Sequence, residues 1–194
     1  MFGSKFDFLL FFDTLKAVNY YAVQVKTRGE EKYIRRFRIL NPGCSIEIYF
    51  PKRTITVRRR GVMTQTTPAV FPGYLFLESD DQLLRSYQWQ FRRTDGFYRF
   101  LKSNQDIRPL SGRDLETVLH FIKRAGPLAG LSQVYFDENS RIVVVEGPLA
   151  GLEGNIIKVD KRKRRAKIKL DLYDDSFTID LGFELMENAA RSRF

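Results

Sequence analysis

The sequence predicts an α+β fold in two parts: an N-terminal α/β sandwich, with a mixed, mainly antiparallel sheet and helices, and a small C-terminal β-barrel. Two observations predict it. Between residues 20 and 124, segments with the alternation of strands are interspersed with segments of helical periodicity. From residue 141 only short strand-like runs recur, and roughly fifty residues in four or five strands can close only a small barrel.

The composition divides the chain further. Residues 125–130 are small and rich in Gly and Pro, and no strong period follows before residue 139, which is typical of a linker. The apolar run within residues 1–18 is too short to span a bilayer and lacks a clear signal-peptide cleavage site. We therefore expect an N-terminal extension at 1–18, a first domain at 19–124, a linker at 125–138, a second domain at 139–187 and a C-terminal tail at 188–194.

The first domain is organised around Phe71–Leu77, a turn that leads into an apolar strand. Pro72 fixes one backbone dihedral and Gly73 admits conformations closed to other residues, so the chain bends sharply before the strand. Aromatic and leucine side chains then alternate, which makes both faces apolar, as in a central strand covered on both sides. The residues alone leave two interpretations open: a core strand, or a strand whose aromatic end is also a docking surface.

The remaining elements of this domain follow from periodicity and end signals. Residues 30–40 place acids in the first turn and basic residues later, which complements a helix dipole. Ser111 is expected to cap the helix that follows it. In chain order we expect a strand at 20–26, a helix at 30–40, a strand at 46–50, a hairpin at 53–66, the strand entered at 71, a helix at 80–89, a strand at 96–101 and a helix at 112–124.

The charge of the chain favours a polyanionic partner, with nucleic acid as the leading candidate. The formal net charge is +10 and the pI is about 9.8. Three arginines, Arg58–Arg60, form the tip of the predicted hairpin, where they are either a solvated turn or a phosphate contact.

The predicted barrel has one basic and one acidic rim. Between positions 158 and 169 the only acid is Asp160, whereas 171–187 hold acids and no basic residue. The basic rim consists of Lys158, Lys161, Arg162, Lys163, Arg164, Arg165, Lys167 and Lys169. This rim is either a nucleic-acid contact or simply an exposed, highly charged hairpin.

The sequence offers no convincing catalytic or metal-binding constellation. Cys44 is the only cysteine, which excludes a disulfide framework and a thiolate cluster and fits a reducing, cytoplasmic compartment. His120 is the only histidine, and its helical setting indicates an ordinary helix residue rather than a ligand. We therefore expect no enzyme activity, no cofactor, no metal ion and no membrane partner.

Motifs in both parts, in this order, resemble the NusG family of transcription elongation factors. The first domain resembles the family's N-terminal (NGN) domain, with the aromatic-led strand Tyr20–Val25, the Phe71–Tyr74 turn and the segment Thr94–Leu101. The second domain resembles a KOW domain, an SH3-like barrel, through the segment Val144–Ile156. The resemblance covers about residues 20–187 of the chain.

The resemblance implies how the protein acts. The first domain is expected to dock on the clamp helices of the largest subunit of RNA polymerase through an apolar patch. By motif position the candidate contacts are Tyr20, Phe71, Pro72, Tyr74 and Phe100. Docking there disfavours paused or terminating states and places Arg58–Arg60 near upstream or non-template DNA. The factor performs no chemistry, stabilises one conformation of the polymerase and is expected to be a monomer.

Two departures from the general factor's pattern point to a specialised paralogue. Leu149 stands where the general factor usually carries an aromatic residue that contacts the ribosome or the termination helicase. Residues 160–169 are also more basic, which resembles the LoaP type of antiterminator, whose KOW domain recognises a hairpin in nascent RNA. We therefore expect a processive antitermination factor whose basic rim binds such a hairpin. The alternative is a general elongation factor whose KOW domain contacts the ribosome or the termination helicase.

Overall fold

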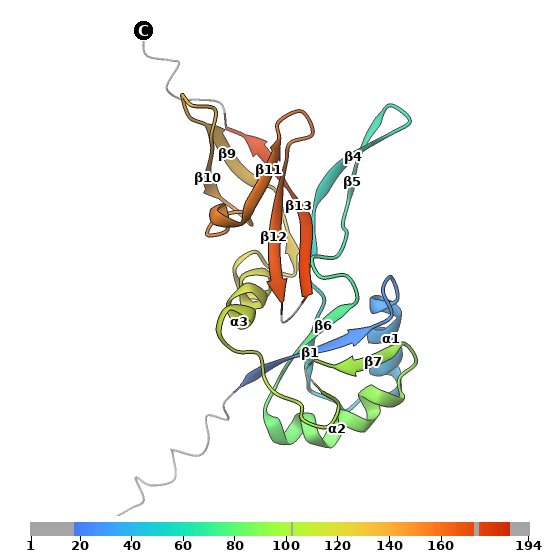
Figure 1. The fold of residues 1–194 in the computed structure, drawn as a ribbon. Helices are drawn as coiled ribbons and strands as arrows, with labels where there is room; N and C mark the ends of the chain where they lie inside the picture. Colours follow the sequence, from blue (N-terminus) through green and yellow to red (C-terminus); the bar gives the residue numbers. More distant parts are fainter. Residues whose placement is uncertain (1–17, 102, 173–174, 187–194) are drawn as a thin grey trace, which may run out of the picture.

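The computed structural model describes residues 18–101, 103–172 and 175–186, and the α+β fold class is confirmed (Figure 1). One part is a sheet covered by helices, and the other is a curled sheet of five strands. The predicted tail at 188–194 and the predicted extension, apart from residue 18, lie outside the described residues.

Four antiparallel strands form the first sheet in the order β2-β6-β1-β7. Their bounds are Asn19–Val25 for β1, Glu47–Tyr49 for β2, Tyr74–Ser79 for β6 and Phe97–Phe100 for β7. β6 lies between β2 and β1, and all its apolar side chains are buried. The prediction that the strand after the turn is central and covered on both faces is therefore confirmed.

Two helices cover one face of the first sheet: α1 (Glu30–Leu40) and α2 (Asp81–Arg93). Phe37 of α1 and Phe91 of α2 are fully buried and stack with their ring centroids 4.0 Å apart. The bounds of α1 are those predicted, whereas α2 continues beyond its predicted end at residue 89. A compact aromatic core therefore lies between the two helices and the sheet.

The opposite face of the first sheet packs on α3 (Gly112–Leu119), on a π-helical turn that continues α3 (η1, His120–Arg124) and on the second sheet. The Ala125 N–H donates to the His120 carbonyl oxygen at 2.8 Å, which is the five-residue spacing of a π-helix. A single apolar cluster runs from this face through α3 into the barrel.

The prediction that Ser111 caps α3 is wrong, because its side chain makes no capping hydrogen bond. Gly112, the next residue, has a φ of 55°, which is not a helical value.

The second sheet has five strands in the order β10-β9-β13-β12-β11. β13 pairs with β9 in parallel, and the other neighbours are antiparallel. Alternate side chains of β12 (Ala166, Ile168, Leu170 and Leu172) are buried, as predicted. The bounds are Ser132–Phe136 for β9, Ile142–Glu146 for β10, Ile156–Asp160 for β11, Arg165–Leu172 for β12 and Asp175–Leu185 for β13, with a 3₁₀ turn (η2, Glu153–Asn155) before β11.

The prediction of a linker at 125–138 is wrong for much of that range. A short strand, β8 (Leu128–Ala129), pairs in parallel with β3 (Lys52–Arg53), and β9 belongs to the second sheet. Ser132 and Val134 of β9 are fully buried. A buried serine in so short a strand interrupts the apolar alternation by which strands are recognised. The division into two domains stays a prediction.

The hairpin expected at 53–66 is formed by β4 (Ile55–Arg59) and β5 (Val62–Thr66), and it extends away from the first sheet beside the barrel (Figure 1). Arg60 and Gly61 at its turn have φ values of 48° and 85°. Positive φ at both central residues is the conformation of a type I′ turn, which matches the twist of a two-residue hairpin.

The base of this hairpin meets the second sheet along a contact that we call the seam, formed by residues 53–56 together with Arg165, Asp180 and Gly182. The Arg53 Nε donates to the Asp180 carbonyl oxygen at 2.9 Å, and the Arg165 guanidinium donates to the Thr56 carbonyl oxygen. The seam therefore joins the predicted first domain to the barrel through the backbone of both.

Replacing Phe37 by Ala is expected to destabilise the protein by about 3–5 kcal/mol, because the ring is fully buried against Phe91. Ile39 lies on the same helix and is 77% exposed, so Ile39→Ala is expected to cost less than about 0.5 kcal/mol. Urea unfolding followed by circular dichroism measures both variants. Equal losses for the two variants would contradict the assignment of the buried face of α1.

Gly182→Ala is expected to destabilise the seam by about 1–3 kcal/mol through overpacking. A Cβ at Gly182 would lie 3.1 Å from the Thr54 carbonyl oxygen and would also overlap the Leu131 side chain. Gly154→Ala is the matched control, because no atom lies within 4 Å of a Cβ placed there. Thermal unfolding compares the two variants, and a loss in the control as large as that of Gly182→Ala would refute the steric explanation.

Candidate docking face and nucleic-acid interface

The turn that leads into β6 is held by contacts with β1 and α1. Gly73 has a φ of 85°, and its N–H donates to the Glu30 Oε1 at 2.7 Å. The Val25 N–H donates to the Gly73 carbonyl oxygen at 2.8 Å. A Cβ at Gly73 would lie 2.8 Å from the Thr27 Oγ1, so the turn requires glycine. These contacts set the position of the aromatic residues on either side of Gly73.

We use the term docking face for the surface that carries four of the predicted polymerase contacts, Tyr20, Phe71, Pro72 and Tyr74. The barrel covers much of this face. Phe71 and Tyr74 are only 1% and 2% exposed, whereas Pro72 is exposed. The Phe177 ring of β13 packs edge-on against Phe71 and Tyr74, with centroid distances of 5.7 and 5.5 Å. In this arrangement, which we call closed, the two aromatic side chains cannot contact another protein.

A polar contact accompanies the aromatic contacts. The Tyr74 hydroxyl donates to the Asp175 carboxylate at the start of β13. Burial, and then the hydrogen bond with this carboxylate, raise the pKa of Tyr74 to about 12. The tyrosine therefore stays protonated, and remains a donor, at neutral pH. No local sequence pattern indicated Phe177 or Asp175 as neighbours of the turn, because about a hundred residues separate them from it.

Phe100, the fifth predicted contact, does not belong to this surface. β7 pairs with β1 so that Phe100 lies opposite Val23, on the side of the sheet covered by α1 and α2. Its ring is fully buried against Phe91 and Phe97, with centroid distances of 6.1 and 5.4 Å. The prediction that Phe100 shares a patch with Tyr74 is therefore wrong, because strand register places them on opposite faces.

Tyr20 lies at the edge of the docking face under a lysine from η1. The Lys123 Nζ lies 2.9 Å from the Glu78 carboxylate and 5.8 and 5.4 Å from the ring centroids of Tyr20 and Tyr49. The Tyr49 hydroxyl donates to the same carboxylate at 2.6 Å. The hydrogen bond with Glu78 is the main reason why the pKa of Lys123 is raised. Lys123 therefore places a positive charge over the aromatic rings at this edge of the docking face. No sequence pattern indicated this contact.

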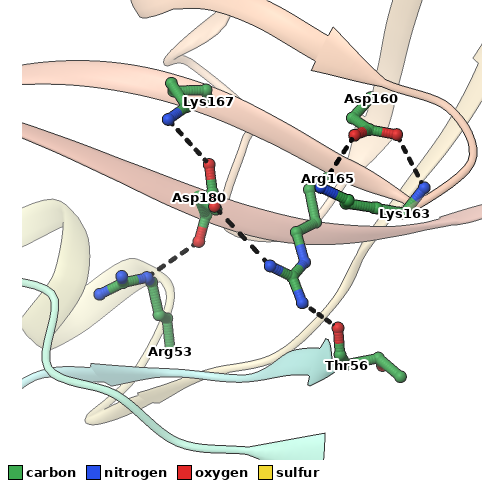
Figure 2. A network of polar contacts seen from close by, with 7 residues as sticks. All are labelled: Arg53, Thr56, Asp160, Lys163, Arg165, Lys167 and Asp180. Carbon is green, nitrogen blue, oxygen red and sulfur yellow. Dashed lines mark hydrogen bonds and ion pairs between the residues drawn. The ribbon is translucent and has the colours of Figure 1, made fainter. Parts of the chain in front are cut away.

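The seam carries an excess of positive charge (Figure 2). Arg165 and Lys167 both face the Asp180 carboxylate, at 3.8 and 3.9 Å, and Arg53 is bonded to its backbone. Burial lowers the pKa of Arg53 to about 10, and the nearby Arg165 acts in the same direction against the attraction of Asp180. The Arg165 Nε is buried without a hydrogen-bond partner. One carboxylate therefore faces three cations.

The structure separates the eight residues of the predicted basic rim into two groups. Arg165 and Lys167 are half-buried at the seam. Lys158, Lys169 and residues 161–164 are exposed, and the last four form the β11–β12 loop. Two of the exposed lysines have acidic neighbours: Lys163 lies 3.8 Å from Asp160, and Lys169 lies 3.7 Å from Asp171. The loop is thus the most accessible part of the rim.

The predicted DNA-proximal hairpin presents Arg58 and Arg60 to solvent at its tip. Val62 and Met63, which follow the turn, are also mostly exposed. The hairpin tip therefore combines cationic and apolar side chains on a projection that rises beside the barrel (Figure 1).

The described part of the chain offers few other kinds of site. Within it, no group of three or more His, Cys, Asp or Glu side chains is arranged to hold a metal ion. None of its helices is long and apolar enough to cross a membrane. His120 is buried and its Nε2 lies 2.8 Å from the Pro148 carbonyl oxygen, which accounts for it as a structural residue.

Known proteins resemble the chain along most of its length. It is 26% identical to the transcription termination/antitermination protein NusG of Thermus thermophilus, over 89% of this chain and 100% of that protein. It is 24% identical to the protein of the same name from Helicobacter pylori strain 26695, over 84% and 94% respectively. A solved structure described as "Domain interaction in Thermotoga maritima NusG" shares the fold, with a TM-score of 0.50 and 16% identity over 85% of this chain and 93% of that one.

A family profile decides the assignment. The profile described as "Transcription termination factor nusG" matches residues 18–119, which is more than half of the chain. Proteins of this family interact with RNA polymerase and are transcription factors, not enzymes. The chain therefore belongs to the NusG family of transcription termination and antitermination factors.

Proposed function

We propose that this protein is a processive antitermination factor of the specialised, LoaP-like kind, which acts in the cytoplasm. In this proposal the docking face binds the clamp helices of the largest subunit of RNA polymerase, and the basic rim of the barrel binds a hairpin in nascent RNA. The observation that carries the docking part is the asymmetry of the first sheet. The helices α1 and α2 cover one face of this sheet. The other face, with Phe71 and Tyr74, is covered by α3 and by the barrel.

Docking requires the barrel to leave this face. In the closed arrangement Phe71 and Tyr74 pack against Phe177 of β13, so polymerase binds only the fraction of molecules in which β13 has moved away. Phe71 also packs against Phe121 of η1, with a centroid distance of 5.7 Å. The apparent dissociation constant then equals the intrinsic one divided by that fraction. The contacts of Phe177 and Asp175 with the docking face therefore set the affinity as well as the arrangement.

On polymerase, the factor would act without chemistry. A protein bound across the clamp shifts the enzyme toward the conformation to which it binds best, and away from paused or terminating states. The hairpin tip, with Arg58 and Arg60 exposed, then lies within reach of upstream or non-template DNA.

The RNA part of the proposal rests on the exposed group of the basic rim. Residues 161–164 and Lys158 project from one end of β11 and β12. Asp160, the one acid in the run, accepts a hydrogen bond from the Lys163 N–H at 2.9 Å. Arg162 and Arg164 are exposed, whereas the Lys161 Nζ lies over the Phe136 ring. Each phosphate that such a residue neutralises releases counterions, so affinity depends steeply on salt.

The position of Leu149 favours RNA over the alternative partners, the ribosome and the termination helicase. Leu149 is fully buried, and its N–H donates to the Ser132 hydroxyl at 2.9 Å. In the closed arrangement this side chain is not available to a partner of the barrel loop, which also contacts η1 through the bond between Pro148 and His120. Leu149 also lacks the aromatic ring that the resemblance assigns to contacts with the ribosome or helicase.

Two variants are expected to change polymerase binding in opposite directions. Tyr74→Ala removes a contact and is expected to abolish association with RNA polymerase. Phe177→Ala removes two aromatic pairs that hold the closed arrangement, together about 1–3 kcal/mol. It is therefore expected to tighten association by roughly 5- to 150-fold. Biolayer interferometry with immobilised core polymerase measures both affinities.

Phe136→Ala is the control for Phe177→Ala, because Phe136 packs edge-on against Phe183 within the barrel at 6.1 Å and away from the docking face. It is expected to leave the affinity for polymerase unchanged. Retained binding by a folded Tyr74→Ala variant would sink the docking assignment.

Arg162→Gln combined with Arg164→Gln is expected to weaken binding of a hairpin RNA and to reduce the slope of log affinity against log salt by roughly 1.4–1.8, at 0.7–0.9 per lost phosphate contact. Fluorescence anisotropy over a salt series gives both quantities. The matched control, Arg85→Gln with Arg93→Gln, removes two exposed charges from α2, on the far side of the first sheet from the barrel. Equal slopes for the two variants would exclude the β11–β12 loop as the RNA contact.

A further inference from the structure

Two basic elements that are far apart in the sequence are neighbours in the closed arrangement. The β4–β5 hairpin, predicted to lie near DNA, rises beside β13 of the barrel, and β13 pairs with β12, which carries part of the basic rim (Figure 1). The bonds from Arg53 to Asp180 and from Arg165 to Thr56 join them at the hairpin base (Figure 2). From there β4 leads to Arg58 and Arg60, and β12 leads back to the β11–β12 loop.

The seam between the two elements is short of negative charge. Arg53 comes from the hairpin side, and Arg165 and Lys167 come from the barrel, with the Asp180 carboxylate as their shared counter-charge. The Asp180 carboxylate oxygens lie 3.8 Å from the Arg165 guanidinium and 3.9 Å from the Lys167 Nζ. Both distances are longer than those of hydrogen bonds. The buried Arg165 Nε has no partner. Arg53 and Arg165 thus lie close together across the seam, and the Arg165 Nε is a hydrogen-bond donor without an acceptor.

A small polar hollow opens at this point. It has a volume of about 150 Å³ and is lined by Lys158, Asp160, Lys163, Arg165, Lys167 and Asp180. Four of the six lining residues are cations, and the two carboxylates are already engaged by them. A phosphate group suits such a site, because it brings negative charge and acceptor oxygens to lysine and arginine donors.

We propose that a hairpin RNA is held across the seam, with its backbone running from the β11–β12 loop over this hollow to Arg58 and Arg60 of the β4–β5 hairpin. The predicted DNA contact and the basic rim then form one RNA-binding surface in the closed arrangement. The inference rests on the proposed binding of RNA by the barrel and adds the β4–β5 hairpin to it.

RNA bound in this way favours the closed arrangement, because its phosphates neutralise like charges on both sides of the seam. Linkage is reciprocal, so movement of the barrel away from the docking face weakens RNA binding by the same factor. When the docking face binds polymerase, the RNA keeps its contacts with the barrel and loses those with the β4–β5 hairpin.

The test uses the full chain with Arg58→Gln and Arg60→Gln, and a synthetic RNA hairpin as the probe. Both arginines are exposed at a turn, so the fold is retained. We expect affinity to fall roughly tenfold or more and the salt slope to decrease by roughly 1.4–1.8. The control, Arg85→Gln with Arg93→Gln, loses the same charge elsewhere and is expected to bind RNA as the unmodified protein does.

Failure of this inference is distinguishable from failure of the proposed function. If Arg162→Gln with Arg164→Gln leaves RNA affinity unchanged, the proposed RNA binding itself fails. If that variant weakens binding and the Arg58, Arg60 variant equals its control, the barrel binds RNA alone and the shared surface is refuted.

A second measurement needs no substitution. Titration of the isotope-labelled protein with the RNA hairpin is expected to shift the amide resonances of residues 55–62 and 158–169 together, with a single dissociation constant. Shifts confined to 158–169 would overturn the proposal. A second contradicting result would come from a DNA duplex of the same length. If the duplex displaces the RNA from residues 55–62 while the barrel stays bound to the RNA, the two elements are separate sites.

Discussion

The packing of Phe177 against Phe71 and Tyr74 is the contact on which the arrangement of the two sheets depends. It closes a single apolar cluster that begins on the first sheet, includes α3 and ends inside the barrel. Without this cover, the first sheet would expose an aromatic face to water, and a contiguous apolar surface of that kind marks a site for another protein. The barrel therefore occupies the place that the family's partner is proposed to take.

The same contact controls the charged surface. As long as β13 lies on the docking face, the β4–β5 hairpin stands beside β12, and Arg53 and Arg165 are held together around Asp180. The aromatic contact and the bonds at the seam thus both join the barrel to the predicted first domain. Movement of the barrel would separate these charges at the moment it uncovers Phe71 and Tyr74. In the proposed function, protein docking and the shared RNA surface are consequently alternatives that depend on one movement, rather than independent properties of two domains.

Much of the fold could be predicted because its periodic elements are long. The helix at 30–40 and the alternation along β12 were recognisable from local spacing, and so was the hairpin with Gly61 at its turn. β9 was missed because its buried Ser132 interrupts the apolar pattern. The face occupied by Phe100 depends on strand register, and burial of Phe71 and Tyr74 depends on residues a hundred positions away. Neither is encoded in local spacing.

The candidate site shows why composition alone is a poor guide to a polyanion-binding surface. Of the basic rim, Lys163 and Lys169 have acidic neighbours and Lys161 lies over the Phe136 ring, with its Nζ 3.9 Å from the centroid. Exposed pairs of this kind contribute little free energy and exchange readily for phosphate. Arg53 and Arg165 differ, because both are half-buried at the seam and the buried Arg165 Nε has no hydrogen-bond partner. In the proposed RNA complex, a phosphate in the hollow beside Arg165 and Lys167 reduces the repulsion among these cations, so the seam is where a bound phosphate contributes most.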